Sequence, residues 1–180
     1  MYELFLEDEK LEEGTSPELI EAELERAKEL DCREPYLFGG ILLIRNHLRF
    51  KRREEALGIA RTMFNDAIRS LPRFVVSIES ELGLALVETG SLEQGLKHAE
   101  AAVARLESQK AIEDDDPHRI YFNYARALKR CNQSAQSSRV LQQAFKTMSD
   151  IEAKLDPMTK RLFRRRPLNL EIAEQLSSDR

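Results

Sequence analysis

The stretch ELGLALVETGSLEQGLKHAEAAV, Glu81–Val103, places glycines where the surrounding residues favour helix. Gly83 and Gly95 lie inside the two helical segments, where a glycine costs about 1 kcal/mol relative to alanine. Gly90 lies between the segments and suits the left-handed position that ends a helix. We interpret the interior glycines as points where two antiparallel helices approach closely, so that contact between the helices compensates for poor helix propensity.

The same arrangement of small residues recurs along the chain, which local propensity alone does not explain. Residues 125–145 repeat the pattern at an offset of 42 residues, and a weaker copy precedes it at an offset of 39. The aligned pairs are Gly83 and Ala125, Gly90 and Asn132, Gly95 and Ser137, and Ala102 and Ala144; in the weaker copy, Ala56 aligns with Gly95, Ala60 with Ala99, and Lys51 falls at the turn.

Nearly every other segment has the 3.6-residue period of an amphipathic helix, and no convincing alternating strand interrupts them. Because the connections are short, consecutive helices should form antiparallel pairs. The sequence predicts an all-α fold, a superhelical stack of about three antiparallel helix pairs plus a C-terminal capping helix. One domain is expected over residues 16–180, preceded by an acidic N-terminal segment over residues 1–15.

Several helix ends can be placed from single residues. Ser16 is the expected N-cap of the first helix. Near the C-terminus, Asp156 and the following proline should begin a short helix. Pro167 should end that helix, and Asn169 should cap the last one, whose amphipathic part is Leu168–Leu176.

Charge is distributed unevenly over the 180 residues, whose formal net charge is −4. Residues 1–34 contain 13 acidic and 4 basic side chains, so this part carries −9 and the remainder +5. Two interpretations stay open for the acidic part: it forms a solvated helix, or it lies against the basic body of the chain.

The amino-acid composition indicates the class of protein and its cellular location. The apolar share of 42% and the charged share of 33% are ordinary for a globular helical protein. Cys32 and Cys131 lie far apart in sequence, as expected of reduced thiols in a cytoplasm. No signal peptide is visible, and the longest apolar run, YLFGGILLI, is far shorter than the ~20 residues that span a bilayer. We therefore expect a cytoplasmic location and no membrane partner.

No residue pattern points to catalysis, a cofactor or a metal. His47, His98 and His118 form no paired metal-binding motif. The chain contains neither a GxxxxGK[ST] phosphate-binding loop nor a GxSxG nucleophile elbow. We therefore expect a protein that is not an enzyme and that binds no cofactor.

The charged runs have simpler interpretations than ligand binding. EDDDP at residues 113–117 lacks the glycine and the ligand spacing of a calcium loop, so Asp116 is interpreted as a helix N-cap. KRR from Lys51 and RRR from Arg164 suit helix C-termini, where cations complement the dipole. The isoelectric point of about 5.6 argues against nucleic acid as a partner.

The repeated pattern resembles the tetratricopeptide repeat, whose hallmark is Leu-Gly in the first helix, a turn glycine and small residues in the second. The spacing near 40 exceeds the usual ~34 residues and is similar to the helical-repeat regions of bacterial signalling ATPases and of LuxR-type regulators related to the maltose activator. The C-terminal part is also similar to the way such regions end. The matching residues are Leu82, Gly83, Leu86, Gly90, Gly95, Ala102, Leu141, Ala144, Arg161, Leu162, Phe163, Pro167, Asn169 and Ile172.

The resemblance implies a scaffold with no activity of its own, in which the first helix of each pair lines a concave face that binds a partner. Arginines recur among the positions that would line this face, and their guanidinium groups suit carboxylates. An acidic peptide or acidic partner helix is therefore the expected ligand. The implied binding residues are Arg45, Arg49, Leu84, Val87, Arg119, Phe122, Arg126, Lys129 and Arg130; Phe38, Ile41, Leu48, Ser77, Ser80 and Glu88 occupy further positions of the same kind.

Other functions stay open at this point. The chain could form a homodimer by burying Phe38, Ile41, Leu84, Val87 and Phe122 against a second copy. It could also be a signal-sensing fragment of a larger ATPase or transcription regulator. The arginines could instead be solvated, or be neutralised by the EDDD run or by the acidic N-terminal helix.

Overall fold

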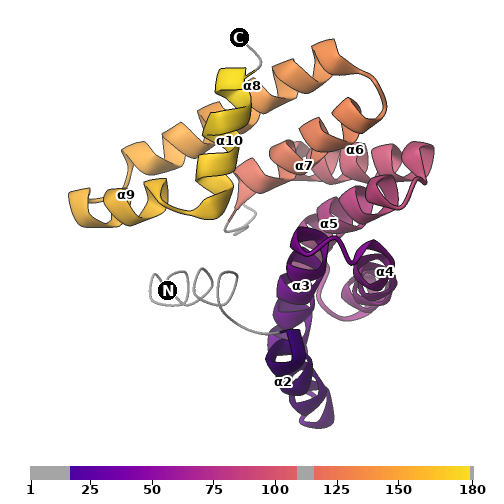
Figure 1. Cartoon of the computed structure of the whole chain (residues 1–180). Coiled ribbons are helices and arrows are strands. Elements are labelled where there is room, and N and C mark those ends of the chain that lie inside the picture. Colours follow the sequence, from indigo (N-terminus) through magenta and orange to yellow (C-terminus); the bar gives the residue numbers. More distant parts are fainter. Residues whose placement is uncertain (1–16, 109–115, 179–180) are drawn as a thin grey trace.

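The computed structural model describes residues 17–108 and 116–178, so Ser16 and the acidic segment of residues 1–15 lie outside the described residues. Within the described ranges, the chain forms nine α-helices, one short 3₁₀ turn at Pro72–Phe74, and no β-strand (Figure 1). The helices are α2 (Pro17–Glu29), α3 (Arg33–Arg49), α4 (Arg53–Ser70), α5 (Val75–Glu88), α6 (Leu92–Ser108), α7 (Pro117–Arg130), α8 (Ser134–Ala153), α9 (Pro157–Arg164) and α10 (Pro167–Ser178). None of these helices has the length and apolar character that crossing a membrane requires.

Four of the helix ends share one geometry. Asp31, Lys51, Gly90 and Asn132 follow α2, α3, α5 and α7, and each has a φ between 51° and 93°. At each of these ends two backbone N–H groups donate to carbonyls of the last helical turn, as in the pair Gln133 N to Leu128 O, at 2.9 Å, and Asn132 N to Lys129 O, at 3.1 Å. This is the Schellman arrangement, which reverses the chain tightly. The expected turns at residues 51, 90 and 132 are thereby confirmed.

The glycines of α5 and α6 lie where the two helices touch, as the sequence predicts. A Cβ added to Gly83 would lie 2.7 Å from the backbone nitrogen of Ala99 and 2.9 Å from the carbonyl oxygen of Gly95. A Cβ added to Gly95 would lie 2.6 Å from the carbonyl oxygen of Gly83. Backbone atoms cannot move aside, so only glycine at both positions allows this approach.

The aligned residues of the next pair make the corresponding contact. The Oγ atom of Ser137, which aligns with Gly95, donates a buried hydrogen bond of 2.8 Å to the carbonyl oxygen of Ala125, which aligns with Gly83. In the preceding pair, Ala56 and Ala60 of α4 are fully buried. Small residues therefore mark the line of contact in three consecutive helix pairs, α3 with α4, α5 with α6, and α7 with α8.

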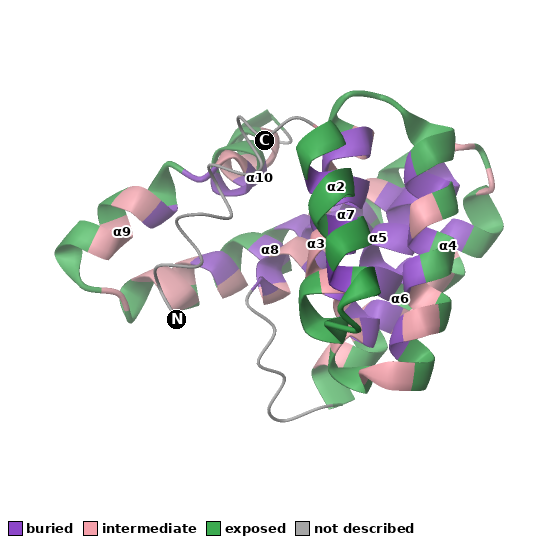
Figure 2. Cartoon of the chain, turned by 90° about the horizontal axis from the view of Figure 1, so that it is seen from below, coloured by how far each residue is buried: buried purple, intermediate pink, exposed green. Residues whose placement is uncertain are grey.

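The core is a series of linked apolar clusters along these pairs. The largest joins α2, α3, α4 and α5, and another joins α7, α8, α9 and α10. Smaller clusters around Val87 and Val76 connect α5, α6 and α7 between them. Buried residues accordingly follow the inner faces of the helices, with exposed residues on the outer faces (Figure 2).

The C-terminal part differs in detail from expectation. Asp156 caps α9 as predicted, accepting from the backbone nitrogens of Met158 and Thr159 at 2.9 and 3.2 Å. The prediction that Pro167 ends a helix is wrong, because Pro167 is the first residue of α10, a position that proline tolerates. Asn169 therefore lies in the first turn of α10, and its amide donates to the carbonyl of Phe163 at 2.7 Å.

Candidate functional site

A cavity of about 350 Å³ lies between α3, α5, α7 and α10. Three of these helices are the first members of helix pairs, and α10, which crosses α8 in Figure 1, supplies the fourth wall. The residues that line the cavity are Arg45, Asn46, Leu48, Arg49, Glu81, Leu84, Arg119, Phe122, Asn123, Arg126, Pro167, Leu168 and Glu171.

Helical spacing explains how the lining side chains come together. Arg45 and Arg49 are four residues apart and share one face of α3. Arg119, Phe122 and Arg126 are spaced by three and four residues, so they share one face of α7. The structure thus brings six of the nine sequence-predicted residues, those five and Leu84, to a single cavity.

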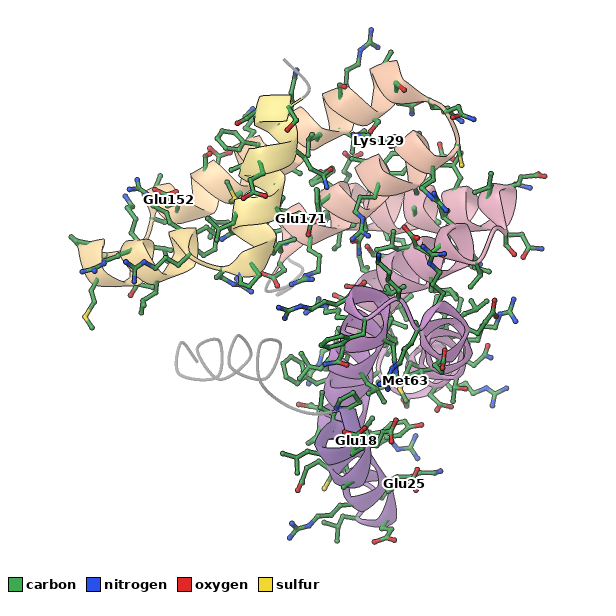
Figure 3. All side chains as sticks on the ribbon, viewed as in Figure 1. Glu18, Glu25, Met63, Lys129, Glu152 and Glu171 are labelled. Atoms are coloured by element: carbon green, nitrogen blue, oxygen red, sulfur yellow. The ribbon has the colours of Figure 1, made fainter. Side chains whose placement is uncertain are left out.

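Three of the predicted residues do not line it. Val87 is fully buried in a cluster with Ala99 and Leu128, because α5 packs against neighbours on nearly all of its faces. Placing Val87 on the ligand-facing surface is therefore wrong. Lys129 and Arg130 are exposed in the last turn of α7, beyond the cavity, and Lys129 is labelled in Figure 3.

The same burial removes most of the apolar surface expected for a dimer. Ile41, Leu84, Val87 and Phe122 are each at most 4% exposed within the single chain. Only Phe38, among the five residues of that hypothesis, is partly exposed. Within the described residues these four side chains are therefore largely covered by the packing of the chain itself, and the homodimer hypothesis stays a prediction.

The cavity has an apolar base and a charged wall. Leu48, Leu84, Phe122 and Leu168 supply the apolar part of the lining. Four guanidinium groups and the two carboxylates of Glu81 and Glu171 supply the charged part, so the lining itself carries an excess of positive charge. The placement of Glu171 on α10 can be followed in Figure 3.

Carboxylates of described residues contact Arg45, Arg119 and Arg126. Arg45 donates through Nε to Glu81 Oε1 at 2.8 Å, and both side chains are largely buried. Arg126 lies 3.8 Å from Glu88 and above the ring of Phe122, with 32% of its side chain exposed. The expectation that the acidic run would neutralise an arginine holds for Asp116, which lies 3.6 Å from Arg119.

Sequence reasoning missed two polar side chains inside the packing, Asn123 and Glu81, and it placed Ser80 on the binding face although Ser80 is buried. Asn123 of α7 donates to Ser80 of α5 at 3.0 Å, and both residues are buried beside the cavity. Glu81 adjoins the Leu-Gly motif in a segment that otherwise reads as apolar, so its pairing with α3 had no local signal. The contribution of α10 depends on a contact between distant parts of the chain, which single-sequence periodicity does not encode.

A buried ion pair holds α10 beside the start of α7. Both guanidinium NH₂ groups of Arg166 donate to the two carboxylate oxygens of Asp116, at 2.9 and 3.0 Å. The RRR run follows a helix C-terminus as predicted, because α9 ends at Arg164, which is exposed and pairs with Glu152. Arg166 is instead buried against Asp116, which the dipole interpretation did not predict. Asp116 is the N-cap residue of α7 as predicted, but its side chain makes no capping hydrogen bond, because it faces Arg166.

The charges of this cluster shift the ionisation of its members. Burial would raise the pKa of Asp116, but the nearby Arg166 and Arg119 outweigh burial and hold that pKa well below its usual range. Burial lowers the pKa of His118, which is fully enclosed, to about 4. The cluster therefore contains an ionised carboxylate and a neutral imidazole near neutral pH.

The part of the chain that the structure describes gives little support for a metal site or for cysteine chemistry. No group of three or more His, Cys, Asp or Glu side chains there is arranged to hold a metal ion. Cys32 is exposed and Cys131 partly exposed, and both are free thiols.

Comparison of the chain with protein-family models, with curated proteins and with solved structures identifies no match. The cavity is thus the best-defined candidate site among the described residues.

Proposed function

We propose that this chain is a non-catalytic protein-interaction module whose cavity binds an acidic peptide segment. In this proposal the helix pairs act as a tetratricopeptide-like scaffold, and the resemblance to the helical-repeat regions of signalling ATPases and LuxR-type regulators gives its setting, a bacterial cytoplasm. The two free thiols are consistent with a reducing compartment.

The convergence of four arginines over an apolar base is the observation that supports the proposal most directly. Guanidinium groups donate paired hydrogen bonds to carboxylates, and the apolar base offers a place for aliphatic or aromatic side chains of the same peptide. Both features are combined in one cavity by α3, α5, α7 and α10. A segment that mixes glutamates with leucines fits this surface best.

The internal ion pairs set the expected strength of binding. A peptide carboxylate must compete with Glu88 for Arg126 and with Asp116 for Arg119. The cavity is also small, near the lower limit of the ~300 to 1,000 Å³ common for ligand sites. We therefore expect a dissociation constant on the order of 10 μM at low salt, typical of a transient interaction.

Charge reversal at the accessible arginines tests the proposal. The probe is a short fluorescein-labelled peptide in which glutamates alternate with leucines, and its binding is followed by fluorescence anisotropy. Arg49→Glu/Arg126→Glu alters the cavity without touching the largely buried Arg45. We expect it to weaken binding by about tenfold or more, and high salt to weaken binding to the unmodified chain.

Lys129→Glu/Arg130→Glu is the matched control, since it makes the same change in net charge outside the cavity. We expect this variant to retain affinity within about threefold, because only long-range electrostatics change. Equal losses in the two variants would show a general charge effect and would remove the cavity from the proposal. Circular dichroism of each variant establishes that the helices are intact.

A further inference from the structure

We propose that the acidic N-terminal segment of this same chain, residues 1–15, is a ligand of the cavity between α3, α5, α7 and α10. This inference rests on the proposed function, because it names the partner of the proposed peptide site. Binding of the segment in cis would make the site self-blocked, so that an external acidic partner has to displace it.

The composition of the segment matches the cavity. Residues 1–15 contain six acidic side chains and one lysine, interspersed with five large apolar ones besides Met1. The cavity presents four arginines and an apolar base formed by leucines and a phenylalanine. The acidic residues of the segment are Glu3, Glu7, Asp8, Glu9, Glu12 and Glu13, and the apolar ones are Tyr2, Leu4, Phe5, Leu6 and Leu11.

The position of Pro17, where the segment leads into α2, also favours this site. The chain reverses tightly at Asp31, so α2 and α3 pack as neighbours running in opposite directions. Glu21, near the start of α2, lies 3.9 Å from His47, near the end of α3. Pro17 therefore begins α2 beside the end of α3 that carries Arg45 and Arg49. In the view of Figure 3, Glu18 accordingly lies nearer than Glu25 to Glu171 of α10.

The length of the segment is more than sufficient. Fifteen residues span up to about 50 Å when extended, at about 3.3 Å per residue. The two arginines of α3 that line the cavity are only about 6 Å apart along the helix axis, because Arg45 precedes Arg49 by four residues. Both therefore lie well within the reach of the segment. A ligand tethered at such short range has an effective concentration in the millimolar range. Even a segment with an intrinsic dissociation constant of about 100 μM would then occupy most of the cavities.

The test uses full-length chains and a labelled peptide of residues 1–15 added in trans. One variant neutralises the segment of the chain itself by Glu7→Gln, Asp8→Asn, Glu9→Gln, Glu12→Gln and Glu13→Gln. We expect this variant to bind the added peptide about tenfold more tightly than the unmodified chain, because its cavity is no longer occupied in cis. The matched control neutralises five exposed glutamates of α2 and α4, by Glu23→Gln, Glu25→Gln, Glu29→Gln, Glu54→Gln and Glu55→Gln, and should bind like the unmodified chain.

The outcomes separate this inference from the proposed function. Equal affinity of the unmodified and segment-neutralised chains for the peptide, with loss of affinity on adding Arg49→Glu/Arg126→Glu, would overturn the inference and leave the peptide site standing. No effect of the arginine reversal in either chain would overturn both. A dimer of the unmodified chain that segment neutralisation dissolves would place the segment in a second copy and would contradict binding in cis.

Discussion

Replacing Gly83 by alanine is the sharpest test of how the helix pairs pack. The added Cβ would lie 2.7 Å from the backbone nitrogen of Ala99 and 2.9 Å from the carbonyl of Gly95, where ordinary contacts begin at 3.4 Å. Both neighbours are backbone atoms of α6, so relief requires that α5 and α6 move apart by about 0.5 to 1 Å. Such a gap forfeits a quarter to a half of the dispersion energy of each affected contact.

Two opposing effects set the magnitude. Alanine improves helix propensity over glycine by about 1 kcal/mol. Overpacking of a tight contact costs about 1 to 3 kcal/mol, and rigid backbone neighbours put Gly83→Ala at the upper part of that range. We therefore expect the free energy of unfolding to fall by about 1 to 2 kcal/mol.

Gly58→Ala is the matched control, since Gly58 is an exposed glycine inside α4 and an added Cβ there meets nothing within 4 Å. It should raise the free energy of unfolding by about 0.5 to 1 kcal/mol through propensity alone. Equilibrium urea denaturation, followed by far-ultraviolet circular dichroism, measures both variants. If Gly83→Ala stabilised the protein as much as Gly58→Ala does, the reasoning about close helix contact would be refuted.

Three further predictions concern the buried ion pair, its histidine and a helix end. Arg166→Met removes the bidentate partner of buried Asp116 and should cost about 3 kcal/mol of unfolding free energy in urea denaturation, whereas Arg164→Met, at an exposed pair, should change little. The pKa of His118 is about 4 in the folded protein, against 6.5 for an ordinary histidine. Above pH 6.5 the imidazole is neutral in both the folded and the unfolded state, so it does not lower the stability. As the pH falls from 6.5 toward 4 the unfolded chain binds a proton more readily than the folded chain, and the free energy of unfolding falls by about 3 kcal/mol. His118→Gln should therefore flatten the fall in melting temperature between pH 6.5 and 4, and an unchanged profile would contradict the neutral buried imidazole. Lys51→Gly should raise the urea midpoint by an amount equivalent to about 1 kcal/mol, because the φ of Lys51 is 60°; a lower midpoint would contradict this assignment.

The features that could be predicted from sequence are those fixed by local geometry. A residue in the left-handed backbone conformation ends a helix through local geometry, and glycine and asparagine adopt that conformation most easily. Gly90 and Asn132 therefore identified their turns from the sequence. Interior glycines are tolerated chiefly where backbones touch, so Gly83 and Gly95 identified the contact between α5 and α6. Arg119 and Arg126 are seven residues apart, so helical periodicity predicts that they share one face of α7, and both line the cavity.

The errors arose where long-range packing decides the environment. Val87 has the spacing of a cavity residue, but α5 is enclosed on several sides, and only the tertiary structure shows which face remains open. Arg166 belongs to a run of three arginines that local reasoning treats alike, yet it alone meets Asp116, fifty residues earlier in the chain. Glu171 reaches the cavity because α10 folds back toward α7, and no pattern near Glu171 encodes that contact.

The most direct test of the peptide site observes the arginine side chains themselves. The ¹⁵N-labelled chain is titrated with the glutamate–leucine peptide while the Nε–Hε signals of its arginines are followed by nuclear magnetic resonance. We predict that the signals of Arg49 and Arg126 shift in a saturable manner and that the signal of Arg130, outside the cavity, stays in place. Saturable shifts confined to Arg130 and other arginines away from the cavity would contradict the account.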